Sequence, residues 1–173
     1  AHVVPEKGVI PYAEKRLGQD LKRMGYTKMI LKSDQEPAIM ALKTAVREIG
    51  EIEIIPEESP AYEHQSNGTV ESAIKRIGGQ VRTLKSALEE RYARKIEGTH
   101  LIIPWMIRYA ANVLSWYGMG QDGRTAYERL KDKKFCRKVA EFGECIWYLR
   151  SGSAGKNKLG SRAEAGIFLG LKE

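Results

Sequence analysis

The chain has 173 residues, the length of one domain or of one domain with a small additional module. Its composition, 42% hydrophobic and 29% charged, is ordinary for a globular protein, and no stretch approaches the roughly 20 uninterrupted apolar residues of a membrane span, so a membrane-spanning protein is excluded. Two cysteines and three histidines without ligand spacing argue against a disulfide scaffold and a zinc finger. The chain opens with neither an initiator Met nor a signal peptide, and we expect it to be an excerpt of a longer chain.

Helices and strands are predicted to alternate over the first third of the chain. The apolar pattern predicts a strand remnant at 1–5, helices at 11–24 and 38–49, and strands at 28–32 and 51–56. Because its centre is uniformly apolar, the strand at 28–32 is expected to lie inside a sheet, covered on both faces. This alternation predicts an α/β layer architecture.

The remaining two thirds begin with a polar loop at 57–68. An amphipathic helix is predicted over 70–92, followed by a buried helix from Pro104 to residue 117 and a short helix at 125–131. Strands at 142–150 and 166–169 then indicate a small β module. Two sets of side chains are expected in the core, in preference to a platform for nucleobases or a disulfide: Trp105, Trp116 and Trp147, and the reduced Cys136 and Cys145.

The excess of basic residues is concentrated near the end of the chain. Lys and Arg number 29 against 22 Asp and Glu, a net charge of +7 and a pI near 9.4. Residues 124–173 hold 12 basic and 6 acidic groups, whereas residues 1–123 hold 17 and 16. This distribution suits a phosphate-rich partner, although a basic surface that serves solubility explains it equally well.

Two carboxylates occupy positions where ligands collect in α/β sheets. Asp34 follows the predicted strand 28–32, and Glu71 falls in the first turn of the long helix. Such a pair can bind Mg²⁺ or Mn²⁺, which prefer oxygen ligands. Helix capping explains the same residues, because Ser33 and Glu36 have the spacing of a capping box, Asp34 is itself a good N-cap, and a glutamate is favoured in a first turn.

Helical spacing extends one face of the long helix beyond Glu71. Lys75, Gly78, Arg82 and Lys85 follow on this face, so a carboxylate precedes several cations. An enzyme that acts on a phosphodiester backbone needs this order, with a metal at the scissile phosphate and cations at its neighbours. A solvated basic face is the alternative explanation.

Four segments together resemble the integrases of retroviruses and LTR retrotransposons. YEHQSNGTVES (62–72) resembles the motif around their last catalytic Glu, and KSDQEP (32–37) resembles the strand end that carries their second catalytic Asp. GRTAYERLKDKK (123–134) is similar to a segment of copia-type elements, and residues 142–170 are similar to the SH3-like module that follows their catalytic core. The four segments occur in the family's order and cover nearly the whole chain.

The resemblance implies an RNase H-like core of the DDE type, in which three carboxylates bind two divalent ions, Mg²⁺ or Mn²⁺. Asp34 and Glu71 would be the second and third catalytic and metal-binding carboxylates. The DNA-binding residues that the resemblance and the helix face imply are Tyr62, Gln65, Asn67, Lys75 and Arg82. The first catalytic Asp is expected upstream of this chain, which would leave the chain inactive alone.

The sequence therefore predicts an α/β, RNase H-like core lacking its first strands at 1–134, and a small all-β SH3-like module at 135–173. The resemblance implies DNA as the partner, integration by polynucleotidyl transfer in the intact parent, nucleic-acid binding in this chain, a homo-oligomer and a nuclear location during integration. Two alternatives stay open: a non-catalytic nucleic-acid-binding protein derived from such an element, and another RNase H-like nuclease.

Overall fold

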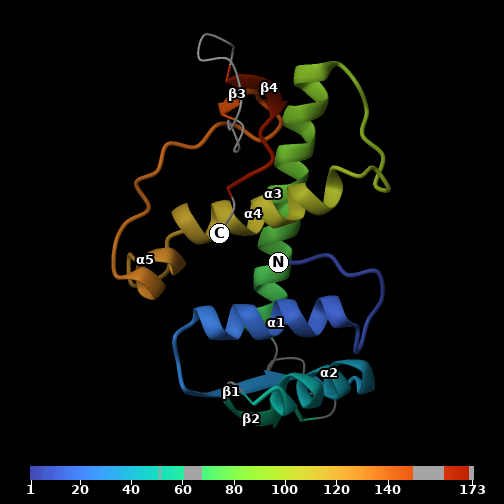
Figure 1. Cartoon of the computed structure of the whole chain (residues 1–173), viewed down its shortest axis with the longest axis vertical. Coiled ribbons are helices and arrows are strands. Elements are labelled where there is room, and N and C mark those ends of the chain that lie inside the picture. The colour runs from blue at the N-terminus through green and yellow to red at the C-terminus, as the bar shows by residue number, and fades with distance from the viewer. Residues whose placement is uncertain (51, 61–67, 150–161, 172–173) are drawn as a thin grey trace. The chain divides into compact units, whose positions relative to one another are not determined.

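The computed structural model describes residues 1–50, 52–60, 68–149 and 162–171, and the chain divides into two compact units, 1–76 and 77–173 (Figure 1). No helix in these ranges combines the length and apolar character that crossing a lipid bilayer requires. Both units mix helices with a small sheet, so the predicted α/β class is confirmed in its general form.

The first unit is built on a parallel pair of strands. It contains α1 (Pro11–Arg23), β1 (Lys28–Ser33), α2 (Pro37–Glu48), β2 (Glu53–Glu58) and the first turns of α3 (Gly68–Tyr92). These elements agree with the predicted ones to within a few residues. Residues 1–5, predicted as a strand remnant, form no strand, so this prediction was wrong.

Helices α1 and α2 pack on the same face of the strand pair. Leu21 of α1, Val46 of α2 and Ile54 of β2 form the buried centre of one cluster, and Met29 and Leu31 of β1 lie against it. Met29 is directly opposite Ile54 in the register, so the two side chains share one face of the sheet. The apolar cluster in the described part of residues 1–76 lies on this face.

The opposite face of the strand pair is open, which corrects the prediction of a strand covered on both faces. Ile30 is 61% exposed and Ile55 is 40% exposed. Two ion pairs lie on either side of them in register, Lys28–Glu53 at 2.6 Å and Lys32–Glu57 at 3.1 Å. The apolar run misled the prediction because Ile30 resembles its partly buried neighbours Met29 and Leu31 in type while pointing to the other face.

The second unit holds the rest of α3 from Ile77, then α4 (Ile103–Tyr117), α5 (Ala126–Lys131), β3 (Cys145–Leu149) and β4 (Ala163–Ile167). The two strands are antiparallel. A capping box begins α5, because Thr125 Oγ1 accepts from Glu128 N at 3.1 Å and the Glu128 carboxylate accepts from Thr125 N at 2.7 Å. The strand pair matches the predicted β module, whereas its SH3-like character and the boundary after residue 134 stay predictions.

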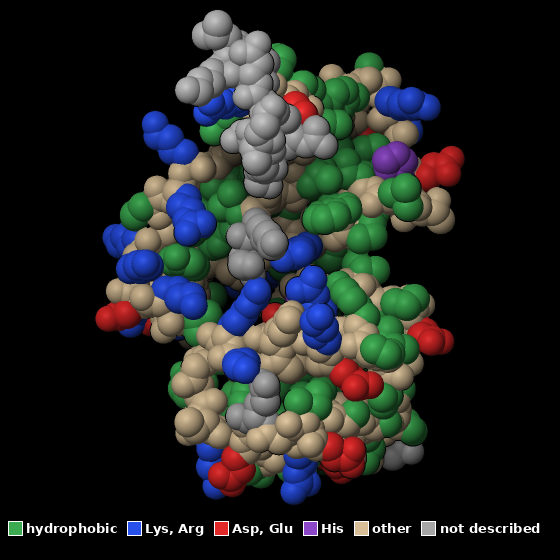
Figure 2. Space-filling view, in the orientation of Figure 1, with side chains coloured by type: hydrophobic (Ala, Val, Ile, Leu, Met, Phe, Trp, Pro, Cys, Tyr) green, Lys and Arg blue, Asp and Glu red, His purple; other side chains and the backbone are tan. Residues whose placement is uncertain are grey.

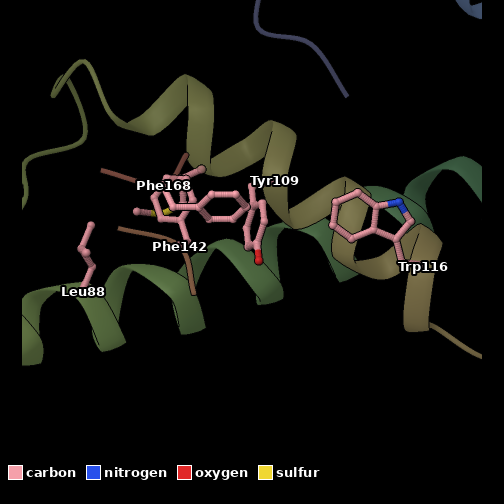
Figure 3. Close-up of a cluster of buried hydrophobic side chains, with 6 residues drawn as sticks. Leu88, Tyr109, Trp116, Phe142 and Phe168 are labelled. Atoms are coloured by element: carbon pink, nitrogen blue, oxygen red, sulfur yellow. The ribbon is translucent and has the colours of Figure 1, made fainter. Parts of the chain in front are cut away.

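An aromatic core holds the second unit together. Tyr109 of α4 lies between three other rings, with centroids 5.3 Å from Phe142, 6.0 Å from Phe168 and 6.2 Å from Trp116 (Figure 3). Its hydroxyl donates to Ala140 O at 3.2 Å, and burial raises the pKa of Tyr109 above its ordinary value. The rings therefore join α4 to Phe142, which precedes β3 in the chain, and to Phe168, which follows β4.

Gly143 in the second unit cannot be replaced without strain. Its φ is +77°, and a Cβ there would lie 2.2 Å from Leu88 Cδ1. The position thus requires a residue that tolerates left-handed backbone and carries no side chain. Next to it, Tyr92 Oη donates to Gly143 O at 2.6 Å, so the end of α3 is tied to the turn before β3.

The expected burial of the tryptophans and cysteines is only partly correct. Trp116 is buried, as predicted, but Trp105 is 50% exposed and Trp147 is 75% exposed. Cys136 and Cys145 are free thiols, and both are exposed. Helix α4 has one exposed side and β3 has one exposed face, whereas an apolar run in the sequence indicates burial on every side.

Candidate functional site

Asp34 lies at the carboxyl end of β1, as predicted, and its side chain is exposed. Its Oδ1 accepts a long hydrogen bond of 3.4 Å from Glu36 N, and its Oδ2 has no hydrogen bond to any described residue. This carboxylate is therefore open to a ligand at the edge of the sheet where parallel strands end.

The capping explanation for Asp34 and Ser33 is wrong. The N-cap of α2 is Glu36, no side chain bonds the helix start, and Pro37 occupies the first turn. Proline favours the first helical position and an extended residue before it, and Glu36 has φ −63° and ψ 122°. Because Pro37 fixes the start of α2, Asp34 lies too far upstream to cap it.

A second carboxylate and a lysine lie beside Asp34. Lys7 Nζ donates to Glu36 Oε1 at 2.9 Å and to Glu36 Oε2 at 3.0 Å. These bonds, together with the charge of Glu36 and a smaller contribution from Asp34, raise the pKa of Lys7. The strand end thus combines two acidic groups and one exposed ammonium.

Lys43 and Ser59 are buried polar residues at the same strand ends that the sequence did not single out. Lys43 is 5% exposed, and its Nζ donates to Ser33 Oγ at 3.1 Å and to Glu57 O at 2.9 Å. Ser59 is 3% exposed, and its N donates to Ser33 O at 2.9 Å. A lysine between Leu42 and Val46 on the apolar face of a helix is the signal that could have revealed Lys43.

Glu71 lies in the first turn of α3, as predicted, and Lys75 lies one turn further along; both are exposed. Arg82 is exposed too and belongs to residues 77–173. Lys85, on the same predicted helix face, is paired with Glu89 at 2.7 Å. Tyr62, Gln65 and Asn67 lie outside the described residues.

The chemistry of the two carboxylates fits a hard divalent cation, because both offer exposed oxygens and one oxygen of Asp34 is unpartnered among the described residues. Within the described ranges, no three or more Asp, Glu, His or Cys side chains gather as a metal site. Each carboxylate lies at the strand or helix end where the sequence pattern predicts it.

Exposed basic side chains follow α5 in the second unit. Lys133, Lys134, Arg137 and Lys138 are all exposed, and none of them forms an ion pair with another described residue. Figure 2 shows Lys and Arg side chains gathered over the segment around α5. These four residues belong to the basic excess that the sequence shows in residues 124–173.

Comparison with known proteins places the fold in a class. The fold is mixed α/β and is similar to that of a retroviral integrase catalytic core. One solved structure with this similarity is the catalytic core domain of BIV integrase, with 23% sequence identity, a TM-score of 0.51 and coverage of 75% of each chain. No protein-family model matches the chain, and no curated protein does. At this identity the likeness is one of fold alone.

Proposed function

We propose that the chain is part of the integrase of a copia-like LTR retrotransposon, whose intact form joins DNA by metal-dependent polynucleotidyl transfer. The observation that carries the proposal is Asp34, an open carboxylate at the carboxyl end of a parallel strand in an integrase-like fold. The order of the four family-like segments supports it.

In this proposal, Asp34 and Glu71 hold Mg²⁺ or Mn²⁺. A divalent ion at a phosphodiester lowers the pKa of bound water and stabilises charge on the phosphate oxygens. Lys75 and Arg82 bind phosphates on either side of the reacting one, and Tyr62, Gln65 and Asn67 approach the DNA ends. Phosphate contacts of this kind position DNA without selecting its sequence. Homo-oligomer formation and a nuclear site of action belong to the same proposal.

The second candidate is a nucleic-acid-binding protein that derives from such an element and performs no catalysis. The exposed basic segment after α5 supports this candidate, because its cations lie far along the chain from Asp34 and Glu71 and require no metal. Salt-dependent binding to DNA is expected under both candidates, whereas binding of a divalent ion is expected only under the first.

The deciding experiment measures Mn²⁺ binding by electron paramagnetic resonance and DNA binding by fluorescence anisotropy on the full chain. We expect the double variant Asp34→Asn with Glu71→Gln to lose Mn²⁺ binding and to keep most DNA binding. The control, Asp132→Asn with Glu48→Gln, removes the same two charges elsewhere and should bind Mn²⁺ like the wild type.

DNA binding without Mn²⁺ binding in the wild type would favour the second candidate. Mn²⁺ binding that survives in the double variant would remove Asp34 and Glu71 as ligands. A chain that binds neither Mn²⁺ nor DNA would overturn both candidates.

A further inference from the structure

We infer that Lys43 is a positioning residue for the Asp34 carboxylate, an inference that rests on the proposed function in so far as Asp34 binds a metal. Lys43 reaches the carboxyl ends of both strands from α2. Its Nζ donates to Ser33 Oγ on β1 at 3.1 Å and to Glu57 O on β2 at 2.9 Å. One side chain thus connects three elements one residue away from Asp34.

The contacts of Ser33 pass this restraint on to Asp34. Ser33 Oγ donates to Asp34 O at 2.9 Å, while Ser33 O accepts from Ser59 N at 2.9 Å. Gln35 Nε2 donates to Ser59 O at 3.2 Å, so the residue after Asp34 is held as well. The backbone on both sides of Asp34 is therefore fixed, although its carboxylate is exposed.

The burial of Lys43 makes a purely structural role a poor explanation. Lysine is almost never buried unless it is paired with an acidic group, and removing an ammonium from water costs several kcal/mol. At 5% exposure, the Lys43 ammonium bonds only a hydroxyl and a carbonyl among the residues that the structure describes. An apolar residue of the same length would pack there at least as well, so the lysine contributes something other than packing.

Residues that orient a metal ligand typically change metal affinity by about 10- to 100-fold when they are replaced. Lys43 has the geometry of such a residue, because it contacts Ser33, which in turn bonds the backbone of Asp34. Neither of its two hydrogen bonds is to the Asp34 carboxylate. Lys43→Met should therefore lower Mn²⁺ affinity by about 10-fold or more, while thermal stability stays equal or rises.

The test uses the full chain labelled with ¹⁵N. Mn²⁺-induced broadening of the Asp34, Gln35 and Glu36 amides reports the local affinity, and hydrogen exchange of the Glu36 amide reports the restraint on Asp34 Oδ1 without any metal. Lys43→Met should lower the Mn²⁺ affinity measured by this broadening by about tenfold. It should also speed exchange of the Glu36 amide relative to the wild type. Lys32→Met, which removes an exposed lysine from β1, should change neither the broadening nor the exchange rate.

Ser33→Ala removes the hydrogen bonds that Ser33 Oγ makes with Lys43 and Asp34, and it leaves the bond from Lys43 to Glu57. This variant therefore tests the inference if Lys43→Met does not fold. Unchanged exchange of the Glu36 amide in a folded variant would overturn the inference. A wild type that binds no Mn²⁺ would overturn the metal site of the proposed function instead, and the exchange measurement would still decide the role of Lys43.

Discussion

The Glu89 carboxylate in α3 binds the segment that follows the helix. It accepts hydrogen bonds from Ile96 N and Lys85 Nζ, both at 2.7 Å, and its side chain is 11% exposed. These bonds, with that to Ile96 first, lower the pKa of Glu89 to about 2. The ionised form is therefore favoured in the folded chain over the unfolded one.

This shift predicts the pH dependence of stability. Because the folded pKa lies below the ordinary value near 4.5, the contribution of Glu89 is fully present above about pH 4.5 and is lost as pH falls towards 2. Glu89→Gln should therefore flatten the loss of stability in this window, as measured by urea unfolding at several pH values. Glu90→Gln, a change at an exposed neighbour, should leave the wild-type slope; an equal effect of both variants would contradict the assignment.

Single residues also mark how far the candidate site could be predicted. The positions of Asp34 and Glu71 follow from strand and helix ends, which the hydrophobic pattern reveals. The network of Lys43, Ser33 and Ser59 does not, because it depends on how a helix lies against strands that are distant in sequence. Pro37 was available as a signal, and it would have excluded Asp34 as a helix cap.

At the scale of elements, the two faces of β1 and β2 should differ in their tolerance of mutation. Ile54 is 5% exposed and belongs to the core of its unit, whereas Ile30 is 61% exposed. Ile54→Ala should reduce the free energy of unfolding by about 2 to 5 kcal/mol. The same change at Ile30 should cost less than about 1 kcal/mol. Urea unfolding measures both, and equal costs would show that the outer face is covered in solution.

The helices were predicted closely because periodicity and end signals act locally. Gly25 and Gly50, with φ of +77° and +73°, directly follow the residues that cap α1 and α2, as their positions in the sequence indicate. Burial was predicted less well, because it depends on the number of layers around an element. Trp147 illustrates this: its strand has only one partner among the described residues, so one face stays exposed.

At the scale of the whole molecule, the uneven charge predicts which cations would bind DNA under the proposed function. Lys133, Lys134 and Arg137 are exposed and form no ion pair with a described residue, whereas Lys7, Lys28 and Lys32 are each paired with a glutamate. Each cation that neutralises a phosphate contributes about 0.9 to the slope of log affinity against log salt. Replacing the first three by Gln should therefore lower the slope by up to about 2.7.

Replacing Lys7, Lys28 and Lys32 by Gln is the matched control, and we expect a smaller change in slope because their glutamates already neutralise them. Anisotropy titrations of one duplex at several salt concentrations measure all three proteins. Equal slopes for the two triple variants would show that net charge, and not the segment after α5, governs DNA binding.

The ion pairs that flank Ile30 and Ile55 also bear on the colloidal behaviour of the chain. Two copies that stacked these sheet faces together would bury the isoleucines, but they would also have to remove the Lys28–Glu53 and Lys32–Glu57 pairs from water. Charged neighbours of this kind protect exposed strands from self-association. Ile30 and Ile55 can therefore stay exposed, because the charged pairs beside them in the register disfavour aggregation through this face.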